Sequence, residues 1–307
     1  MTWLIAVDGG GSKTRALLAT LDGHIVAEAM SGPSNYQSVG LDQAVAAIRE
    51  ACQAAFVAAG LDPQRSEAAA ACFGLAGVDR PEDQDRFTAR LAQERLARRF
   101  LIVNDAELVL AAGCPDGWGV ALISGTGSIC LGRSPDGQQA RAGGWGHILG
   151  DEGSGFAIAV HALRLATQTA DGRAQAPTLL KAALDFWALQ TPEQLIDLVY
   201  QQLGSSPARI ARFATPVLQL AEAGDPSAQQ VLEDAAEALA RHVTAVTKRL
   251  GLDRLPLAFG GGVLCGSPLL RSAVIARLEH PIAQTTVVDD PALGALQIAQ
   301  RLVIDFG

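Results

Sequence analysis

Residues 3–20 read WLIAVDGGGSKTRALLAT: an apolar run ends on an aspartate, and a turn of glycine and hydroxyl residues leads into a second apolar run. The pattern predicts two strands, 3–7 and 15–21, joined by a flexible turn. The turn is not a Walker A loop, because the G-x-x-x-x-G-K-S/T spacing is absent and a strand, rather than a helix, follows it.

This first turn can bind phosphate in another way. Glycines allow backbone N–H groups to converge on an anion, and hydroxyl and ammonium groups add further donors. Asp8, at the end of the first strand, is placed to hold Mg²⁺ through water, since Mg²⁺ keeps several waters and takes few carboxylates. An ordinary hairpin turn explains the motif equally well when it is taken alone. The candidate nucleotide ligands in the turn are Gly10, Gly11, Ser12, Lys13 and Thr14.

Composition limits the class of protein. The chain has 307 residues, enough for two domains with separate cores. Its formal net charge of −8 argues against nucleic acid or an anionic membrane as the main partner. The five cysteines are scattered and lack C-x-x-C spacing, which is typical of small buried side chains in a reducing compartment. No signal peptide and no apolar run of transmembrane length is visible, so we expect a cytoplasmic protein.

The order of predicted elements suggests two similar halves. In the first half we expect strands at 3–7, 15–21, 25–29, 68–77 and 100–105, and helices at 41–60 and 81–99. In the second we expect strands at 118–124, 127–133, 138–144, 255–262 and 283–288, helices between 152 and about 250, and a last helix at 291–302. Each half begins with three strands around a glycine-rich turn, which favours an internal duplication.

Two further glycine-rich segments resemble ligand loops. LISGTGSIC, residues 122–130, places Gly125, Thr126 and Gly127 between two strands, where they form a second candidate anion-binding turn. FGGGVLCGSPLL, residues 259–270, ends a strand in the glycine triplet 260–262 before a helix expected near Pro268, with Ser267 as its N-cap. Backbone at such a triplet can lie flat against an adenine or ribose. Each segment alone is equally compatible with a tight turn.

Asp105 ends the strand expected at 100–105 and begins a helix. It is either the N-cap of that helix or a general base that accepts a hydroxyl proton as the oxygen attacks a γ-phosphate. Its position at the end of a strand in an α/β fold favours the functional role.

The segment GGWGHILGDEGSGFAI, residues 143–158, combines an indole between glycines with carboxylates before a helix. Asp151 either caps that helix, with Glu152 in its first turn, or binds sugar hydroxyls beside Trp145. His147, Asp151 and His161 together suggest a metal, but no H-E-x-x-H or His-Cys cluster is present, so structural roles are favoured. Asn35, in a loop, either forms an Asx turn or presents its amide to a substrate.

In this order, DGGGSKT, NDA, SGTGS and GGWGHILGDEGS resemble the N-acetylglucosamine and glucosamine kinases of the BadF/BadG/BcrA/BcrD-type ATPase family, within the sugar kinase, Hsp70 and actin superfamily. The resemblance covers nearly the whole chain. It implies an α/β protein of two RNase H-like (actin-like ATPase) domains with an interdomain cleft. The expected domains are residues 1–113, with the last helix, 291–307, packing back on them, and residues 114–290.

The same resemblance implies transfer of the ATP γ-phosphoryl group, with Mg²⁺, to the 6-hydroxyl of an amino sugar. Ser12 and Thr126 would contact the phosphates, and Asp105 would be the base. The triplet Gly260, Gly261 and Gly262 would line the adenosine site. The residues expected to hold the sugar are Asn35, Gly144, Trp145, Gly146 and Asp151. A homodimer is common in this branch.

Some points stay open at the level of sequence. The sugar is N-acetylglucosamine, glucosamine or N-acetylmuramic acid, since one acyl group changes the shape of a pocket. An alternative function is a nucleotide-dependent switch that drives a partner enzyme. Related iron–sulfur activators need clustered cysteines, and no such cluster is legible here. This favours the kinase.

Overall fold

The computed structural model describes residues 2–78, 80–203 and 206–304. Residues 305–307, the end of the expected last helix, lie outside this part. The chain divides into two compact units: unit 1 is Met1–Gly117 with Asp290–Gly307, and unit 2 is Trp118–Asp289. Within the described ranges, no helix is both long enough and apolar enough to cross a membrane.

Unit 1 contains a five-stranded sheet in the order β3-β2-β1-β4-β5. Its strands β1, β2 and β3 are antiparallel neighbours, whereas β4 and β5 run parallel to β1. The elements are β1 (Trp3–Gly9), β2 (Thr14–Thr20), β3 (Ile25–Ser31), α1 (Tyr36–Val39), α2 (Leu41–Ala58), β4 (Ala68–Leu75), α3 (Pro81–Glu94), β5 (Ala97–Asn104), α4 (Asp105–Gly113) and α13 (Ala292–Ile304).

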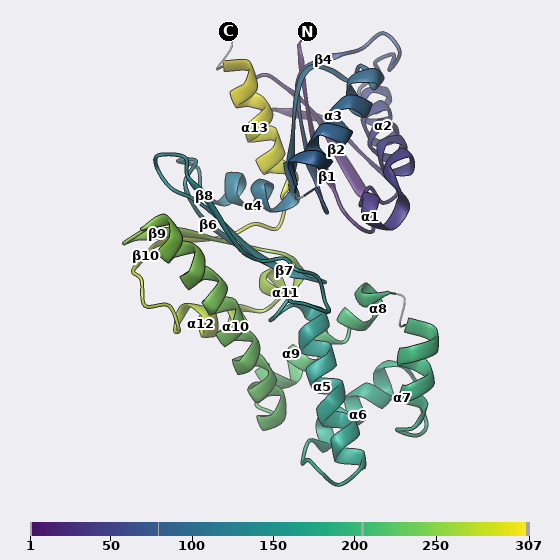
Figure 1. The fold of residues 1–307 in the computed structure, drawn as a ribbon. Helices are drawn as coiled ribbons and strands as arrows, with labels where there is room; N and C mark the ends of the chain where they lie inside the picture. The colour runs from purple at the N-terminus through teal and green to yellow at the C-terminus, as the bar shows by residue number, and fades with distance from the viewer. Residues whose placement is uncertain (1, 79, 204–205, 305–307) are drawn as a thin grey trace. The chain divides into compact units, whose positions relative to one another are not determined.

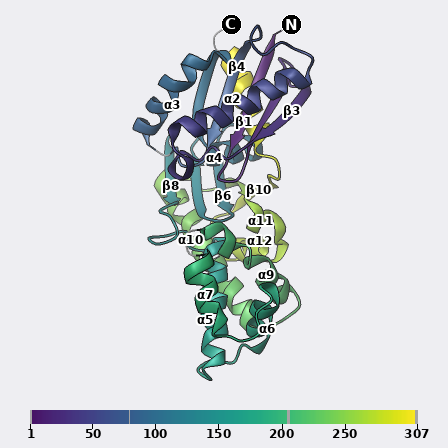
Figure 2. The ribbon, with the colours of Figure 1, turned by 90° about the vertical axis from the view of Figure 1, so that its right-hand side faces the viewer.

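The alternation of side chains along β1 and β2 builds two cores, one on each face of this sheet. Ile5 and Leu18 face a cluster formed with α2 and α3, and Leu4 and Leu17 face a second cluster formed with α4 and α13. Figures 1 and 2 show α2 on one side of the strands and α13 on the other. Because both faces are covered, the middle residues of each strand, 4–7 in β1 and 16–19 in β2, are all apolar and buried.

Unit 2 repeats the topology of unit 1. Its sheet has the order β10-β9-β6-β7-β8, with β6, β7 and β8 antiparallel and β9 and β10 parallel to β6. Replacing β6–β10 by β1–β5 gives the strand order of unit 1 with the same directions, so the predicted duplication is confirmed. The elements are β6 (Gly119–Ser124), β7 (Ser128–Arg133), β8 (Gln139–Gly143), α5 (Gly155–Ala170), α6 (Pro177–Phe186), α7 (Gln194–Asp197), the π-helical turn η1 (Leu198–Leu203), α8 (Pro207–Ala211), α9 (Ala214–Glu222), α10 (Pro226–Leu250), β9 (Leu255–Gly260), α11 (Gly262–Gly266), α12 (Pro268–Ile275) and β10 (Ile282–Val287).

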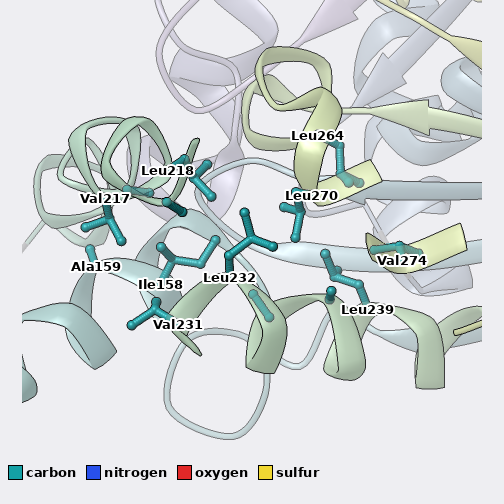
Figure 3. Packing of buried hydrophobic residues seen from close by; sticks show 14 of the residues in the cluster. Ile158, Ala159, Val217, Leu218, Val231, Leu232, Leu239, Leu264, Leu270 and Val274 are labelled. Carbon is teal, nitrogen blue, oxygen red and sulfur yellow. The ribbon is translucent and has the colours of Figure 1, made fainter. Parts of the chain in front are cut away.

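The core of unit 2 is centred on the long helix α10. Its buried positions recur every three or four residues, as expected for an amphipathic helix, and they face the sheet as well as α5, α9 and α12. Figure 3 shows Ile158, Val217, Leu232, Leu270 and Val274 from these helices pointing into one interior. Asp225 caps α10 by accepting a hydrogen bond from the Ala228 amide at 2.9 Å.

Two predicted helix limits are wrong. The helix expected at 81–99 ends at Glu94, Arg95 adopts a left-handed conformation with φ 51°, and β5 begins at Ala97. The helical segment expected from residue 152 begins at Gly155, so Glu152 precedes the helix. After α2, Gly60 adopts φ 75°, the left-handed conformation that commonly follows the end of a helix.

Candidate functional site

Three parallel strands of unit 1 end at the same edge of their sheet. Gly9, the last residue of β1, pairs with Leu75, the last of β4, which pairs with Asn104, the last of β5. The glycine-rich loop, the loop after β4 and Asp105 therefore leave the sheet side by side. Because β4 lies between them, β1 and β5 are about 10 Å apart. Ligands of open α/β sheets bind at this carboxyl edge.

The loop at residues 10–13 is closed by its own backbone and tied to residues 34–35. The Gly10 amide donates to the Lys13 carbonyl at 2.9 Å, and the Gly10 carbonyl accepts from the Ser34 and Asn35 amides at 3.0 and 3.3 Å. Gly11, Ser12 and Lys13 are exposed. No atom lies within 4 Å of a Cβ placed at Gly11, so the loop has room for a ligand.

Thr14 differs from its neighbours in the loop. Its side chain is fully buried, and its hydroxyl donates to the Gly32 carbonyl at 2.8 Å. This hydrogen bond fastens the start of β2 to the end of β3. The arrangement supports a role for Thr14 in holding the loop rather than in touching a phosphate.

Asp8 is half-buried near the end of β1. Burial, followed by the neighbouring carboxylate of Asp290, raises the pKa of Asp8, while Lys13 and Arg15 act in the opposite direction. Asp290 in turn accepts a hydrogen bond from Arg15 Nη1 at 2.7 Å. A divalent cation stabilises the ionised form of a carboxylate that is partly buried beside a second carboxylate.

This donor set suits Mg²⁺ bound mainly by water and phosphate. Within the described residues, no group of three or more His, Cys, Asp or Glu side chains is placed to hold a metal ion. Mg²⁺ commonly takes one or two carboxylates together with substrate phosphates, so Asp8 beside the open glycine loop fits such a site.

Asn35 lies between the loops that follow β1 and β4. It caps the short helix α1, because its Oδ1 atom accepts from the Gln37 amide at 3.1 Å, so the Asx turn is present. A Cβ placed on Gly77 would lie 2.9 Å from the same Oδ1 atom. The side-chain nitrogen of Asn35, Nδ2, makes no hydrogen bond in the described part of the chain, and it can donate to a ligand. The following Tyr36 donates its hydroxyl to buried Asp83 at 2.6 Å, which anchors this turn to α3.

Asp105 is the first residue of α4 and is half-buried. The N-cap role considered for it is wrong, because Asn104 is the cap and its Oδ1 accepts from the Ala106 amide at 2.9 Å. The carboxylate of Asp105 instead belongs to the first turn of α4.

In unit 2, the second glycine turn is fastened to the N-terminus of α5. The Gly125 amide donates to the Gly127 carbonyl at 2.9 Å, and the Gly125 carbonyl accepts from the Gly155 amide at 2.8 Å. The hydroxyls of Ser124 and Ser128 donate to the carbonyls of residues 153 and 152. Thr126, at the tip of the turn, is exposed.

The glycine triplet 260–262 lies against this second turn. Gly260 pairs with Ile123 across β9 and β6. Gly261 has φ 82°, and a Cβ there would lie 2.4 Å from the Ser124 carbonyl oxygen. Only glycine allows this approach. The helix expected near Pro268 is present as α12, which begins at that residue, and a short additional helix, α11, begins at Gly262. Ser267 caps α12, accepting from the Leu270 amide at 3.3 Å.

Asp151 is held in a strained conformation beside the second turn. It is 9% exposed and has φ 56°, which is uncommon for a residue other than glycine. Backbone amides of Ser128 and Gly146 donate to its carboxylate, but burial outweighs them and raises its pKa. The helix-cap role considered for Asp151 is wrong, because Ser154 caps α5 and accepts from the Ala157 amide at 3.2 Å.

Trp145, six residues before Asp151, presents an open aromatic face. Its side chain is 69% exposed between Gly144 and Gly146, both of which have positive φ. The Arg141 guanidinium lies 5.7 Å from the centre of its ring and donates to the Gly144 carbonyl at 2.9 Å. An exposed indole beside a buried carboxylate suits the apolar face and hydroxyl groups of a sugar.

Some residues that contact the candidate site residues were not predicted from the sequence. Asp290 could have been found, because two consecutive aspartates, residues 289–290, precede the last helix. Tyr36 and Asp83 had no local signal, because they are far apart in sequence. The same is true of His242 on α10, whose Nε2 atom lies 3.5 Å from Glu152 Oε2.

Comparison with known proteins agrees with this geometry. The sequence model of the BadF/BadG/BcrA/BcrD ATPase family matches residues 5–299. An N-acetylmuramic acid/N-acetylglucosamine kinase of Clostridium acetobutylicum is 34% identical over 98% of this chain and 99% of its own length. An N-acetyl-D-glucosamine kinase of Dictyostelium discoideum is 31% identical over 96% of this chain and 97% of its own.

A solved structure shares the fold over nearly its full length. A candidate N-acetylglucosamine kinase from Chromobacterium violaceum superimposes with a TM-score of 0.78, at 32% identity, over 97% of this chain and 99% of the other. With its two mixed sheets of repeated topology and a sequence match over nearly all its residues, the chain belongs to the BadF/BadG/BcrA/BcrD ATPase family.

Proposed function

We propose that this protein is an ATP-dependent amino-sugar kinase that transfers the γ-phosphoryl group of ATP to the 6-hydroxyl of an N-acetylglucosamine-type sugar. The relatives at 31–34% identity support the kinase and its class of substrate. The observation that carries the proposal for this chain is the shared carboxyl edge of β1, β4 and β5. The glycine loop and Asp105 emerge from this edge, and the backbone of Asn35 is hydrogen-bonded to the loop.

Each group at this edge has a task in phosphoryl transfer. The backbone amides and hydroxyls of residues 10–13 hold phosphate oxygens, and Asp8 holds Mg²⁺ through water. When bound, Mg²⁺ neutralises charge on the phosphates. Asn35 donates its free amide hydrogens to the sugar. The Asp105 carboxylate accepts the hydroxyl proton as the sugar oxygen attacks.

The groups of unit 2 supply the other contacts in this proposal. Thr126 and its flanking glycines bind phosphate oxygens, and the triplet Gly260, Gly261 and Gly262 offers flat backbone to adenosine. Trp145 packs on the sugar, while Asp151, flanked by Gly144 and Gly146, accepts hydrogen bonds from its hydroxyls. Burial strengthens these hydrogen bonds, because water competes less for the carboxylate.

The test is a coupled assay of the purified protein with ATP and Mg²⁺ over a panel of hexoses, amino sugars and N-acyl amino sugars. Phosphorylation restricted to amino sugars, with product at the 6-position, supports the proposal. Asp105→Asn is expected to lower kcat by about 10²–10⁴-fold with little change in sugar affinity. Asp116→Asn, at an exposed carboxylate of the same unit, is the matched control and keeps normal kinetics. Near-normal turnover of Asp105→Asn would refute the role of this residue.

The nucleotide-dependent switch predicts a different result in the same assay. A switch hydrolyses ATP at a rate independent of added sugar and forms no sugar phosphate. The comparisons favour the kinase, since the relatives that cover almost the entire chain are named as kinases. The homodimer implied by the resemblance stays a prediction, which sedimentation of the purified protein tests.

A further inference from the structure

One face of helix α10 supports the segment that carries Asp151. Ala235, Leu239 and His242 are spaced by four and three residues, so they share one side of the helix. A Cβ placed on Gly153 would lie 2.5 Å from Leu239 Cγ and 2.8 Å from the Ala235 carbonyl oxygen. A Cβ on Gly143 would lie 3.0 Å from His242 Cε1. Both ends of the segment 143–153 therefore rest on this stripe.

His242 is the polar member of the stripe. Its side chain is only 13% exposed, and its Nε2 atom lies 3.5 Å from Glu152 Oε2. Burial lowers the pKa of His242, against the opposing effects of Glu152 and Asp151. Its Nδ1 atom is buried and has no hydrogen-bond partner among the described residues. A proton on Nδ1 would be a buried donor with no acceptor, which favours the neutral ring with its proton on Nε2, the nitrogen nearer to Glu152.

Glu152 transmits any displacement to Asp151, its direct neighbour. The Glu152 carbonyl accepts a hydrogen bond from the Ser128 hydroxyl at 2.7 Å, and the Ser128 amide donates to the Asp151 carboxylate. Asp151 itself is in the left-handed region, so its conformation depends on restraint from its surroundings. Two contacts restrain the adjacent Glu152: the Ser128 hydroxyl contacts its carbonyl, and His242 contacts its side chain.

We propose that His242 is a positioning residue for the sugar site: by donating a hydrogen bond to Glu152 it holds the segment 143–153 in the conformation in which Asp151 and Trp145 meet the substrate. The inference rests on the proposed function, because it assigns His242 to the sugar and not to the nucleotide. His242 touches neither substrate. Its loss therefore weakens sugar binding while leaving the use of ATP unchanged.

The kinetic test compares three histidine variants. His242→Leu fills the buried site without a donor, and His242→Gln replaces Nε2 with an amide nitrogen. His161→Leu is the matched control, because His161 also faces a carboxylate, Asp234, at 3.7 Å within unit 2. Loss of one hydrogen bond to a charged group is expected to raise the KM for the sugar about tenfold in His242→Leu. We expect the KM for ATP to stay within twofold, His242→Gln to recover most of the loss, and the control to match the wild type.

A double-mutant cycle decides whether the effect passes through Glu152. In a Glu152→Ala background, His242→Leu should cause no further rise in the KM for the sugar. An equal rise in both backgrounds would overturn the proposal, as would a loss shared equally between sugar and ATP. An unchanged KM for the sugar in His242→Leu would also overturn it.

A measurement without substrate separates this inference from the proposed function. The ¹⁵N spectrum of the ligand-free protein, assigned with His242→Gln, should show the Nε2–H tautomer for His242 at pH 7 and a change in Glu152→Ala. If the wild type phosphorylates no sugar but this tautomer is present, the proposed function fails while the His242–Glu152 hydrogen bond stands. If the tautomer is absent or insensitive to Glu152→Ala, the positioning role fails whatever the activity.

Discussion

Replacing Gly261 by alanine tests the junction between the glycine triplet and the second turn. The backbone at this residue has φ 82°, where an L-residue costs about 1–2 kcal/mol. The added Cβ would also lie 2.4 Å from the oxygen and 2.6 Å from the carbon of the Ser124 carbonyl. No rotamer relieves an overlap with backbone, and such overpacking adds about 1–3 kcal/mol. The free energy of unfolding should therefore fall by about 2–5 kcal/mol.

The assay is thermal and denaturant unfolding of the ligand-free protein. For a unit of this size, each kcal/mol shifts Tm by about 2–4 °C, so the transition of unit 2 should move down by roughly 4–20 °C. Gly262→Ala is the matched control, because no atom lies within 4 Å of a Cβ there and the residue begins α11. We expect this control to change Tm by no more than about 2 °C, since alanine suits a helix.

Nucleotide binding gives a second measurement of the same change. The overlap at Gly261 is relieved when its backbone and that of Ser124 and Gly125, which carry the second turn, move apart. ATP affinity of Gly261→Ala should therefore fall together with its stability. A variant as stable as the wild type, or a control that is equally destabilised, would refute the close approach of the two segments.

Two further predictions concern unit 1. Because burial raises the pKa of Asp8, the folded protein keeps this proton at pH values where the unfolded chain has lost it. The stability of the fold therefore falls as the pH rises from the ordinary aspartate pKa of 3.8 through the pKa of Asp8 in the folded protein. Asp8→Asn should therefore unfold at a higher temperature than the wild type at pH 7 without ligand, with a smaller difference near pH 4, while losing kinase activity; an equal Tm at pH 7 contradicts this. Tyr36→Phe removes the hydroxyl that donates to buried Asp83 and should cost about 1–3 kcal/mol of unfolding free energy in a urea titration. A cost below about 0.5 kcal/mol would show that Asp83 finds another donor.

The strand-turn-strand start of each half could be predicted, because the apolar runs and the glycines between them are neighbours in the sequence. Apolar residues of β type flank glycines in residues 3–20 and again in residues 122–130. The tertiary structure agrees with these local signals, because both faces of β1 are covered and every apolar residue of this strand packs in one of the two clusters. The identical strand orders of the two sheets follow from the repeat of these local signals.

The end of α3 could not be predicted, because β5 is an edge strand. Edge strands carry charged side chains, and Arg98 and Arg99 make the beginning of β5 look like the continuation of a charged helix. The chain reverses at Arg95, in a left-handed conformation that usually calls for glycine. No glycine marks the position, so the usual signal is missing.

The candidate loops could be located where consecutive residues carry the signal, and their ligand roles stay predictions. The loops at 10–14, 125–127 and 260–262 were found by their glycines. The choice of cap failed at two places, because Asn104 and Asp105, and likewise Asp151 and Ser154, are all good cap residues and only the backbone geometry decides between them. His242 could not be found at all, because only the packing of α10 brings it to Glu152.

The return of α13 to unit 1 has a consequence for biosynthesis. Ala292, Ala295 and Leu296 complete the cluster that covers Leu4 and Leu17, yet the ribosome makes them only after all of unit 2. At usual rates of translation, that delay is roughly 10–35 s. During this time one apolar face of the nascent first sheet lacks the part of its cover that α13 provides, and this part is open to chaperones or to misassociation. Unit 2, whose residues are contiguous, can collapse in the meantime and so precede the unit that begins the chain.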